Sequence, residues 1–231
     1  MKIILFTLIL LAEIRIVPAQ TIKYISESIC DSINKIESTS SEEMLAAQRS
    51  IYRDEMVKYP TLIVDITDLN KPHQYNEFNY KINRQLLKSC PKYEDQFSLL
   101  PLSKILDVEG LFIKNQYDSL EREIIEFIYF NKIDLVVVSI DDVYPYNDIY
   151  NFGTGHLESW KTGKRYELGG ILIAFSKTLN QVSITLSEKT ISVISKNDCN
   201  KIIQEIILPN FEKGDYFKGI MDCIRALKDK V

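Results

Sequence analysis

Acidic side chains stand at the ends of predicted strands and helices, and they are the residues of this chain best suited to chemistry. They are Asp107, Glu109, Asp141, Asp142, Glu167 and Asp198. In an open α/β sheet, ligands gather at the carboxyl ends of the strands, and Ca²⁺ takes six to eight oxygen ligands from such loops. We therefore predict a calcium site formed by Asp107, Asp141 and Glu167, with Glu109, Asp142 and Asp198 as further candidate ligands.

The same acids also have a purely structural interpretation, which stays open at this point. Carboxylates are common in surface turns and at helix starts, and Asp198 and Asp215 stand where their oxygens could cap helices. Convergence of Asp107, Asp141 and Glu167 on one cleft would favour the metal site, and scatter would favour the structural interpretation.

Motifs for the common catalytic mechanisms are missing from the sequence. Asp141 and Asp142 follow an apolar run, but the pattern Asp-Asp-Val-Tyr lacks the second Asp, two residues on, of aspartyl phosphatases. There is no Gly-x-Ser-x-Gly elbow, and the only histidines are His73 and His156. No Ser or Thr follows Gly163-Lys164, so this pair is no phosphate loop. A catalytic residue cannot be assigned from these patterns.

The cysteines are even in number, which favours disulfides in an exported protein. Cys199 and Cys223 each lie 12 residues from Phe211, in the break between the last two predicted helices. If these helices fold back on each other, the two cysteines lie at the same level, so we predict a Cys199–Cys223 disulfide. That leaves Cys30 to pair with Cys90. Free buried thiols are the alternative, and metal binding is disfavoured because no Cys-x-x-Cys spacing occurs.

The first 19 residues have the pattern of a secretory signal peptide. Lys2 precedes an apolar stretch over residues 3–12, and Val17-Pro18-Ala19 has small residues where signal peptidase cuts. We expect cleavage near Ala19 and a secreted or periplasmic protein. Glu13 and Arg15 interrupt the pattern, which leaves an uncleaved anchor as the alternative.

Composition argues against two classes of partner. No later stretch approaches the roughly 20 apolar residues of a membrane span, so we expect none in the mature chain. The net charge of −4 gives no basic field for nucleic acid, and we expect no nucleic-acid binding. An unknown envelope protein is the kind of partner that fits an exported chain.

Residues 20–90 are predicted to form a helical accessory region. Ile22, Ile25 and Ile29 begin an apolar stripe at helical spacing, the hydroxyl cluster at 38–41 opens a second helix, and a third covers Asn76–Ser89. Residues 62–66 fit either a strand or the end of the second helix. Residues 91–103 are predicted to be a linker.

Helices alternate with short apolar strands over residues 104–231, which predicts a three-layer α/β sandwich. We expect a helix at 116–130, a buried strand at 134–140 and a helix at 147–160 that Gly153 and Gly155 interrupt. Strands at 170–175 and 182–186 follow. The last two helices are expected to break at Pro209 and restart after Asp215.

Several motifs of this second region resemble the TPM domain family. They are Leu106-Asp107-Val108-Glu109-Gly110-Leu111, Trp160-Lys161-Thr162-Gly163, Gly170-Ile171-Leu172-Ile173-Ala174 and the tail from Ile207 to Ile220. The resemblance implies an α/β sandwich with an acidic crevice that binds calcium or shows weak phosphatase activity on phosphate monoesters. It makes a calcium- or partner-binding envelope module the expected function and a weak metal-dependent phosphatase the alternative.

The chain departs from the family pattern at two positions. Gly169 precedes Gly170 where the family has an acidic residue or Asn, and Leu186-Ser187-Glu188-Lys189 replaces a glycine-rich turn. Both departures put inherited catalysis in doubt. The amino-terminal helices look similar to accessory regions on exported proteins of Bacteroidetes.

Overall fold

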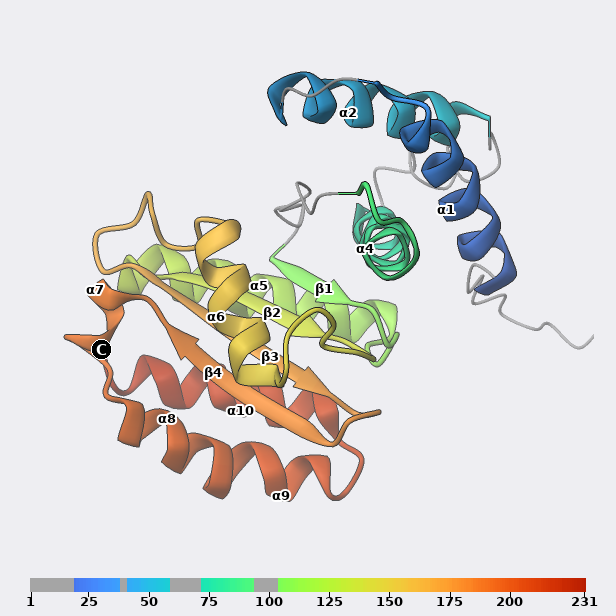
Figure 1. Cartoon of the computed structure of the whole chain (residues 1–231). Coiled ribbons are helices and arrows are strands. Elements are labelled where there is room, and N and C mark those ends of the chain that lie inside the picture. Colours follow the sequence, from blue (N-terminus) through green and yellow to red (C-terminus); the bar gives the residue numbers. More distant parts are fainter. Residues whose placement is uncertain (1–18, 38–40, 59–71, 94–103) are drawn as a thin grey trace, which may run out of the picture.

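The protein consists of a helical region followed by an α/β domain (Figure 1). The computed structural model describes residues 19–37, 41–58, 72–93 and 104–231. The helical region contains α1 (Ala19–Asn34), α2 (Ser41–Val57) and α4 (Pro72–Ser89). The predicted strand or helix end at 62–66 lies outside the described residues. Within them, no helix is long and apolar enough to cross a membrane.

The α/β domain is built on a four-stranded sheet in the order β1-β2-β3-β4. The strands are β1 (Ile105–Asp107), β2 (Asp134–Ser139), β3 (Gly170–Ser176) and β4 (Gln181–Leu186). The first three are parallel, and β4 runs antiparallel to β3. Every residue of β2 and β3 is buried, as expected for parallel strands covered on both faces. The sequence prediction missed β1, because three residues carry no readable periodicity.

Helices cover both faces of this sheet, so the predicted three-layer α/β architecture is confirmed. On one face, Ile105, Val137 and Ile173 pack against α5 (Lys114–Asn131) and the last helices. On the other face, Leu106, Val136 and Leu172 pack against α6 (Ile149–Ser159). Tyr80 of α4 belongs to this second core, so the helical region contributes to the sheet's outer layer.

The glycines of α6 do not interrupt the helix, contrary to the prediction. A Cβ at Gly153 would lie 2.4 Å from the hydroxyl oxygen of Thr185 on β4, and one at Gly155 would lie 2.4 Å from the Tyr146 ring. Their absent side chains therefore let α6 run unbroken against β4 and the preceding loop.

The carboxyl-terminal helices differ from the prediction at one point. The run formed by α8 (Lys196–Ile202), η1 (Ile203–Ile207) and α9 (Leu208–Phe211) passes through Pro209, where we had expected a break. Pro209 comes two residues after the end of the π-helical turn η1, so its missing N–H falls where the regular i→i−4 ladder has already shifted to i→i−5 bonding. The predicted restart is correct: the Asp215 carboxylate accepts a hydrogen bond from the N–H of Lys218 and caps α10 (Tyr216–Lys228).

One of the two predicted disulfides is present. Cys30 at the end of α1 is bonded to Cys90 just after α4, with a Cα–Cα distance of 5.5 Å. The predicted Cys199–Cys223 bond is wrong, because both are free thiols buried in the core between sheet and helices. The two do lie near each other: burial raises the pKa of the Cys223 thiol, and so does the charge of Cys199.

Candidate functional site

Asp107 ends β1 and is held by two hydrogen bonds at the carboxyl edge of the sheet. One carboxylate oxygen accepts from the hydroxyl of Ser139, which ends β2. The other accepts from the N–H of Phe112 at 2.8 Å. Because Asp107 is only 2% exposed, these bonds satisfy a buried carboxylate and fix the loop between β1 and α5.

Asp141 and Asp142 follow β2, and both pair with basic residues of α4. Asp141 accepts from Arg84 at 2.6 Å, and Asp142 pairs with Lys88. Burial opposes ionisation of Asp141, but the hydrogen bond and charge of Arg84 outweigh it, so the pKa of Asp141 is lowered. These pairs attach α4 to the sheet edge.

The other predicted ligands are also dispersed. Glu109 accepts hydrogen bonds from the N–H groups of Lys177 and Thr178 in the turn after β3, and Glu167 is exposed. Asp198 pairs with Lys230 at 3.3 Å. The residue that caps α8 is Ser195, not Asp198: its hydroxyl accepts from the Asp198 N–H.

The structure therefore does not bring Asp107, Asp141 and Glu167 together. Over the described ranges, no group of three or more His, Cys, Asp or Glu side chains could hold a metal ion. The three residues do border the loops that the sequence indicated. Their side chains do not converge, because Asp107 and Asp141 bond different groups and Glu167 is exposed. As a set they do not fit a calcium ion.

Sequence reasoning missed Glu77 of α4, which lies near Asp107. Burial first, and then the charge of Asp107, raise the pKa of Glu77, and the charge of Lys81 lowers it; the result is a pKa of about 8. A pattern in the sequence could not have found this pair, because its members come from different regions of the chain.

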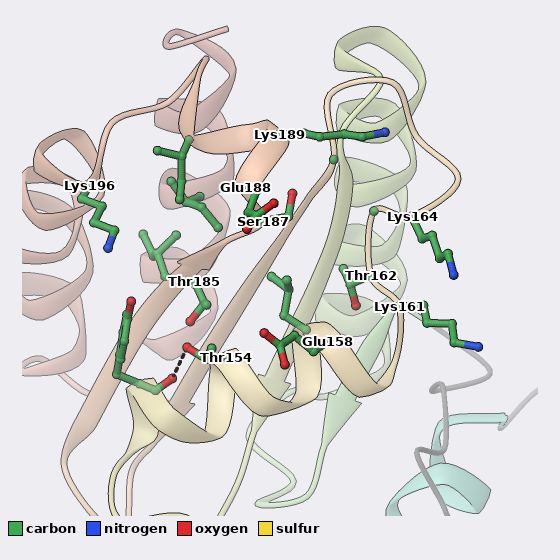
Figure 2. A pocket seen from close by; sticks show the side chains of 17 residues that line it. Thr154, Glu158, Lys161, Thr162, Lys164, Thr185, Ser187, Glu188, Lys189 and Lys196 are labelled. Carbon is green, nitrogen blue, oxygen red and sulfur yellow. Dashed lines mark hydrogen bonds between the residues drawn. The ribbon is translucent and has the colours of Figure 1, made fainter.

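A cavity of about 600 Å³ opens at the other end of the sheet, between α6 and the end of β4 (Figure 2). Its walls come from α6, the loop at 161–164, the residue before β3, the end of β4 and α7 (Glu188–Ile191). The carboxylate of Asp134, which starts β2, accepts from the N–H of Gly163 at 3.1 Å and pairs with Lys104 at 2.7 Å. Asp134 thereby holds the loop that forms one wall.

Two threonines of the cavity lining have buried hydroxyls without a hydrogen-bond partner. Thr162 and Thr185 are each 4% exposed, and their hydroxyl oxygens contact no donor or acceptor in the described structure. Buried polar groups are nearly always paired, so each exception calls for an explanation. Neither threonine carried a motif that could have indicated it from the sequence.

Comparison with protein families matches residues 105–230 to the TPM domain (TPM_phosphatase). The match spans more than half of the chain. This protein belongs to the TPM domain family. The helices α1, α2 and α4 precede the TPM domain, and α4 contributes Arg84, Lys88 and Glu77 to its edge.

Two solved structures are similar to this chain. The N-terminal domain of a protein from P. gingivalis, determined by solution NMR, aligns with a TM-score of 0.50 and 16% identity, over 55% of this chain and 80% of that one. The BA42 protein of the psychrophilic bacterium Bizionia argentinensis has a TM-score of 0.44 and 14% identity, over 53% and 83% of the two chains. No curated protein matches the chain significantly.

Thr185 and Thr190 are both buried in the TPM domain, but only the Thr190 hydroxyl has hydrogen-bond partners. Substituting each of them by valine therefore tests how much those hydrogen bonds stabilise the fold. Thr190 is fully buried, and its hydroxyl bonds the carbonyls of Leu168 at 2.8 Å and Gly170 at 3.1 Å. Thr190→Val removes the single O–H donor that these two carbonyls share, although the Gly170 carbonyl still accepts from the Ser187 N–H, and should destabilise the fold by about 1–3 kcal/mol. Thr185→Val removes an unpaired hydroxyl, so the free energy of unfolding should stay level or rise. Urea denaturation of both variants checks this, and equal losses would show that Thr185 has a partner in solution.

Proposed function

We propose that this protein is an exported binding module in which the TPM domain and the helical region share a weak calcium site. The observation that carries the proposal is the proximity of Glu77 on α4 to Asp107 on β1: burial, first, and the charge of Asp107 raise the pKa of Glu77. Two neighbouring carboxylates repel each other when both are ionised, and a divalent cation offsets that repulsion. Such an ion would strengthen the attachment of α4 to the TPM domain.

The donor set allows an ion but limits its affinity. Both oxygens of Asp107 already accept hydrogen bonds, yet a carboxylate has about four acceptor positions in all. Two carboxylates supply fewer oxygens than the roughly six to eight that calcium takes, so water would complete the shell. We therefore expect binding in the millimolar range.

Calcium should raise the melting temperature of the purified protein. An ion that binds only the folded state adds about 2.7 kcal/mol at a hundredfold excess over Kd, and magnesium should add less because it retains its waters. Thermal melts in millimolar calcium measure this for the wild type, for Glu77→Gln and for Glu167→Gln. The shift should vanish in Glu77→Gln and persist in Glu167→Gln, whose exposed carboxylate is a matched control.

A melting temperature unmoved by calcium in the wild type, or a shift that survives in Glu77→Gln, would remove the calcium proposal and leave a partner-binding module.

The weak phosphatase that the family resemblance implies is tested on the same samples, with a generic phosphate monoester in the presence and absence of calcium. Export is tested by sequencing the amino terminus of the protein recovered outside the cytoplasm, where the expected first residue is Gln20.

A further inference from the structure

We propose that one end of the TPM domain binds the surface of an anionic membrane. This basal edge comprises the last turn of α5, the loop that joins α6 to β3, and the segment from the end of β4 through α7, that is, residues 129–132, 158–169 and 186–191. It lies where β2 and β3 begin, since their first residues, Asp134 and Gly170, pair with each other. The proposed calcium site at Asp107 lies where the parallel strands end, so the two proposals are independent.

Hydrogen bonds join the three segments of the basal edge into one surface. The N–H of Leu168 donates to the carbonyl of Lys132 at 3.2 Å, and the hydroxyl of Thr190 donates to the carbonyl of Leu168 at 2.8 Å. The Lys189 Nζ donates to the carbonyl of Tyr166 at 3.5 Å. The end of α5 and the short helix α7 therefore both pack against the loop before β3.

Two aromatic side chains protrude from the basal edge into solvent. Phe130 is 71% exposed and Tyr129 is 66% exposed, the two highest values among the large hydrophobic side chains of the described ranges. Their ring centroids lie 5.1 Å apart, and the Nζ of Lys132 lies 4.7 Å from the Tyr129 ring. Ile125, one turn earlier on α5, and Ile191 on α7 are also exposed. Apolar groups gathered in this way beside charged ones mark an interaction surface.

Basic side chains outnumber acidic ones on the basal edge. The five basic residues are Lys132, Lys161, Lys164, Arg165 and Lys189, and the three acidic ones are Glu158, Glu167 and Glu188. All five basic side chains are exposed. Across the described part of the chain none of them forms an ion pair, whereas Lys88, Lys104 and Lys228 do. Because the whole chain carries a net charge of −4, this local excess of positive charge is complementary to an anionic surface.

The helical region does not cover the basal edge in the described structure. It is attached where β2 ends, through the pairs of Arg84 and Lys88, and Figure 1 shows α7 at one end of the molecule and α1, α2 and α4 toward the other. The side chains of Lys161, Lys164 and Lys189 extend away from the cavity between α6 and β4, all on one side of it (Figure 2). They are therefore placed to meet a partner outside the domain.

The combination of side chains favours a lipid surface over a nucleic acid. Aromatic rings reside at the level of the lipid head groups, and anionic lipids attract lysines and arginines near them. Exposed aliphatic groups such as Ile125 and Ile191 gain from the boundary with the acyl chains, whereas the phosphate backbone of a nucleic acid offers them no apolar contact. In the bound state, Tyr129 and Phe130 enter the head-group region and the basic side chains contact lipid phosphates.

Co-sedimentation of the purified protein with vesicles tests the proposal. Vesicles of phosphatidylcholine with about one third phosphatidylglycerol should bind the protein about tenfold better than vesicles of phosphatidylcholine alone, and added salt should weaken this binding. Residues 3–12 are themselves apolar and are shared by every variant, so the variants are compared with one another.

The charge contribution is tested by the same change at two places. Lys164→Glu combined with Arg165→Glu should weaken binding to the anionic vesicles about tenfold. Lys114→Glu combined with Lys213→Glu changes the net charge equally, at exposed lysines that begin α5 and precede α10, outside the basal edge. This control should have less than about a threefold effect, because salt screens charges that lie far from the lipid surface.

The aromatic contribution has a matched control on the same helix. Phe130→Ser combined with Tyr129→Ser should weaken binding about tenfold, whereas Ile113→Ser, at a residue that is 62% exposed just before α5, should bind as the wild type. All substituted side chains are exposed, so the melting temperatures should stay close to that of the wild type. Equal binding of the wild type to anionic and neutral vesicles overturns the proposal. So does equal binding by the basal-edge variants and their controls, or binding of a short single-stranded oligonucleotide in place of the vesicles.

Discussion

Alanine at Gly163 should destabilise the protein by about 4 kcal/mol or more, which is at the extreme of single substitutions. Gly163 has φ +80°, and a Cβ there would lie 2.2 Å from both the carbonyl carbon of Gly169 and the nitrogen of Gly170. These atoms are backbone, so no side-chain rotation relieves the clash. The start of β3 and the loop at 161–164 would have to separate.

Gly110→Ala is the matched control for this substitution. Gly110 also has a positive φ, +66°, but a Cβ there meets nothing within 4 Å. Alanine at Gly110 should therefore lower the free energy of unfolding only by the cost of a left-handed backbone conformation, about 1–2 kcal/mol. Urea denaturation of both variants measures the two free energies of unfolding. Similar losses at the two positions would show that the loop moves freely away from β3.

Glu77→Gln should stabilise the protein at alkaline pH and flatten its pH dependence. Burial, first, and the charge of Asp107 raise the pKa of Glu77 from 4.5 to about 8. Between these two values the folded state binds more protons than the unfolded state, so stability is greatest below pH 4.5 and falls as pH rises to about 8. Each pKa unit corresponds to about 1.4 kcal/mol, so the variant should gain on the order of 1–3 kcal/mol at pH 8 after allowance for partial solvent screening.

The measurement is the free energy of unfolding of the wild type and the variant from pH 5 to pH 9. The quantity compared is the difference between the two curves, because His156, whose pKa burial lowers from 6.5 to about 4, contributes to both proteins. A depressed histidine makes stability fall as pH falls through that interval, opposite in sign to Glu77. Parallel curves for the wild type and Glu77→Gln would mean that Glu77 is ionised and solvated in the folded protein.

Elements with strong apolar runs could be predicted from the sequence, whereas contacts between distant segments could not. Leu135 to Val138 indicated a buried strand, and Asp215 indicated a helix cap; both are confirmed. Asp141 was correctly placed at a strand end, but its partner Arg84 comes from 57 residues earlier, and no periodicity reports such a pairing.

Two wrong predictions have the same physical cause. In each of them a residue type is interpreted without knowledge of the residues that pack against it. The sequence predicts a helix interruption at Gly153, yet this glycine permits close packing against Thr185. Cys199 and Cys223 were correctly placed near each other, but proximity does not make a bond, and both thiols pack in the core. The cavity and its two unpaired threonines depend wholly on tertiary structure.

The Cys30–Cys90 disulfide shortens the covalent path along which a mechanical force would travel through the chain. The bond joins residues 60 apart in sequence, linking the end of α1 to the end of α4. A pulling force at the amino terminus of α1 would pass through the bond from Cys30 to Cys90 and bypass residues 31–89, which include α2 and α4. From Cys90 the load would continue along the backbone toward β1, so the pairs of Arg84 with Asp141 and of Lys88 with Asp142 lie outside the covalent load path. Under oxidising conditions the protein should therefore extend under load by a short length, and reduction should release the slack of the intervening segment.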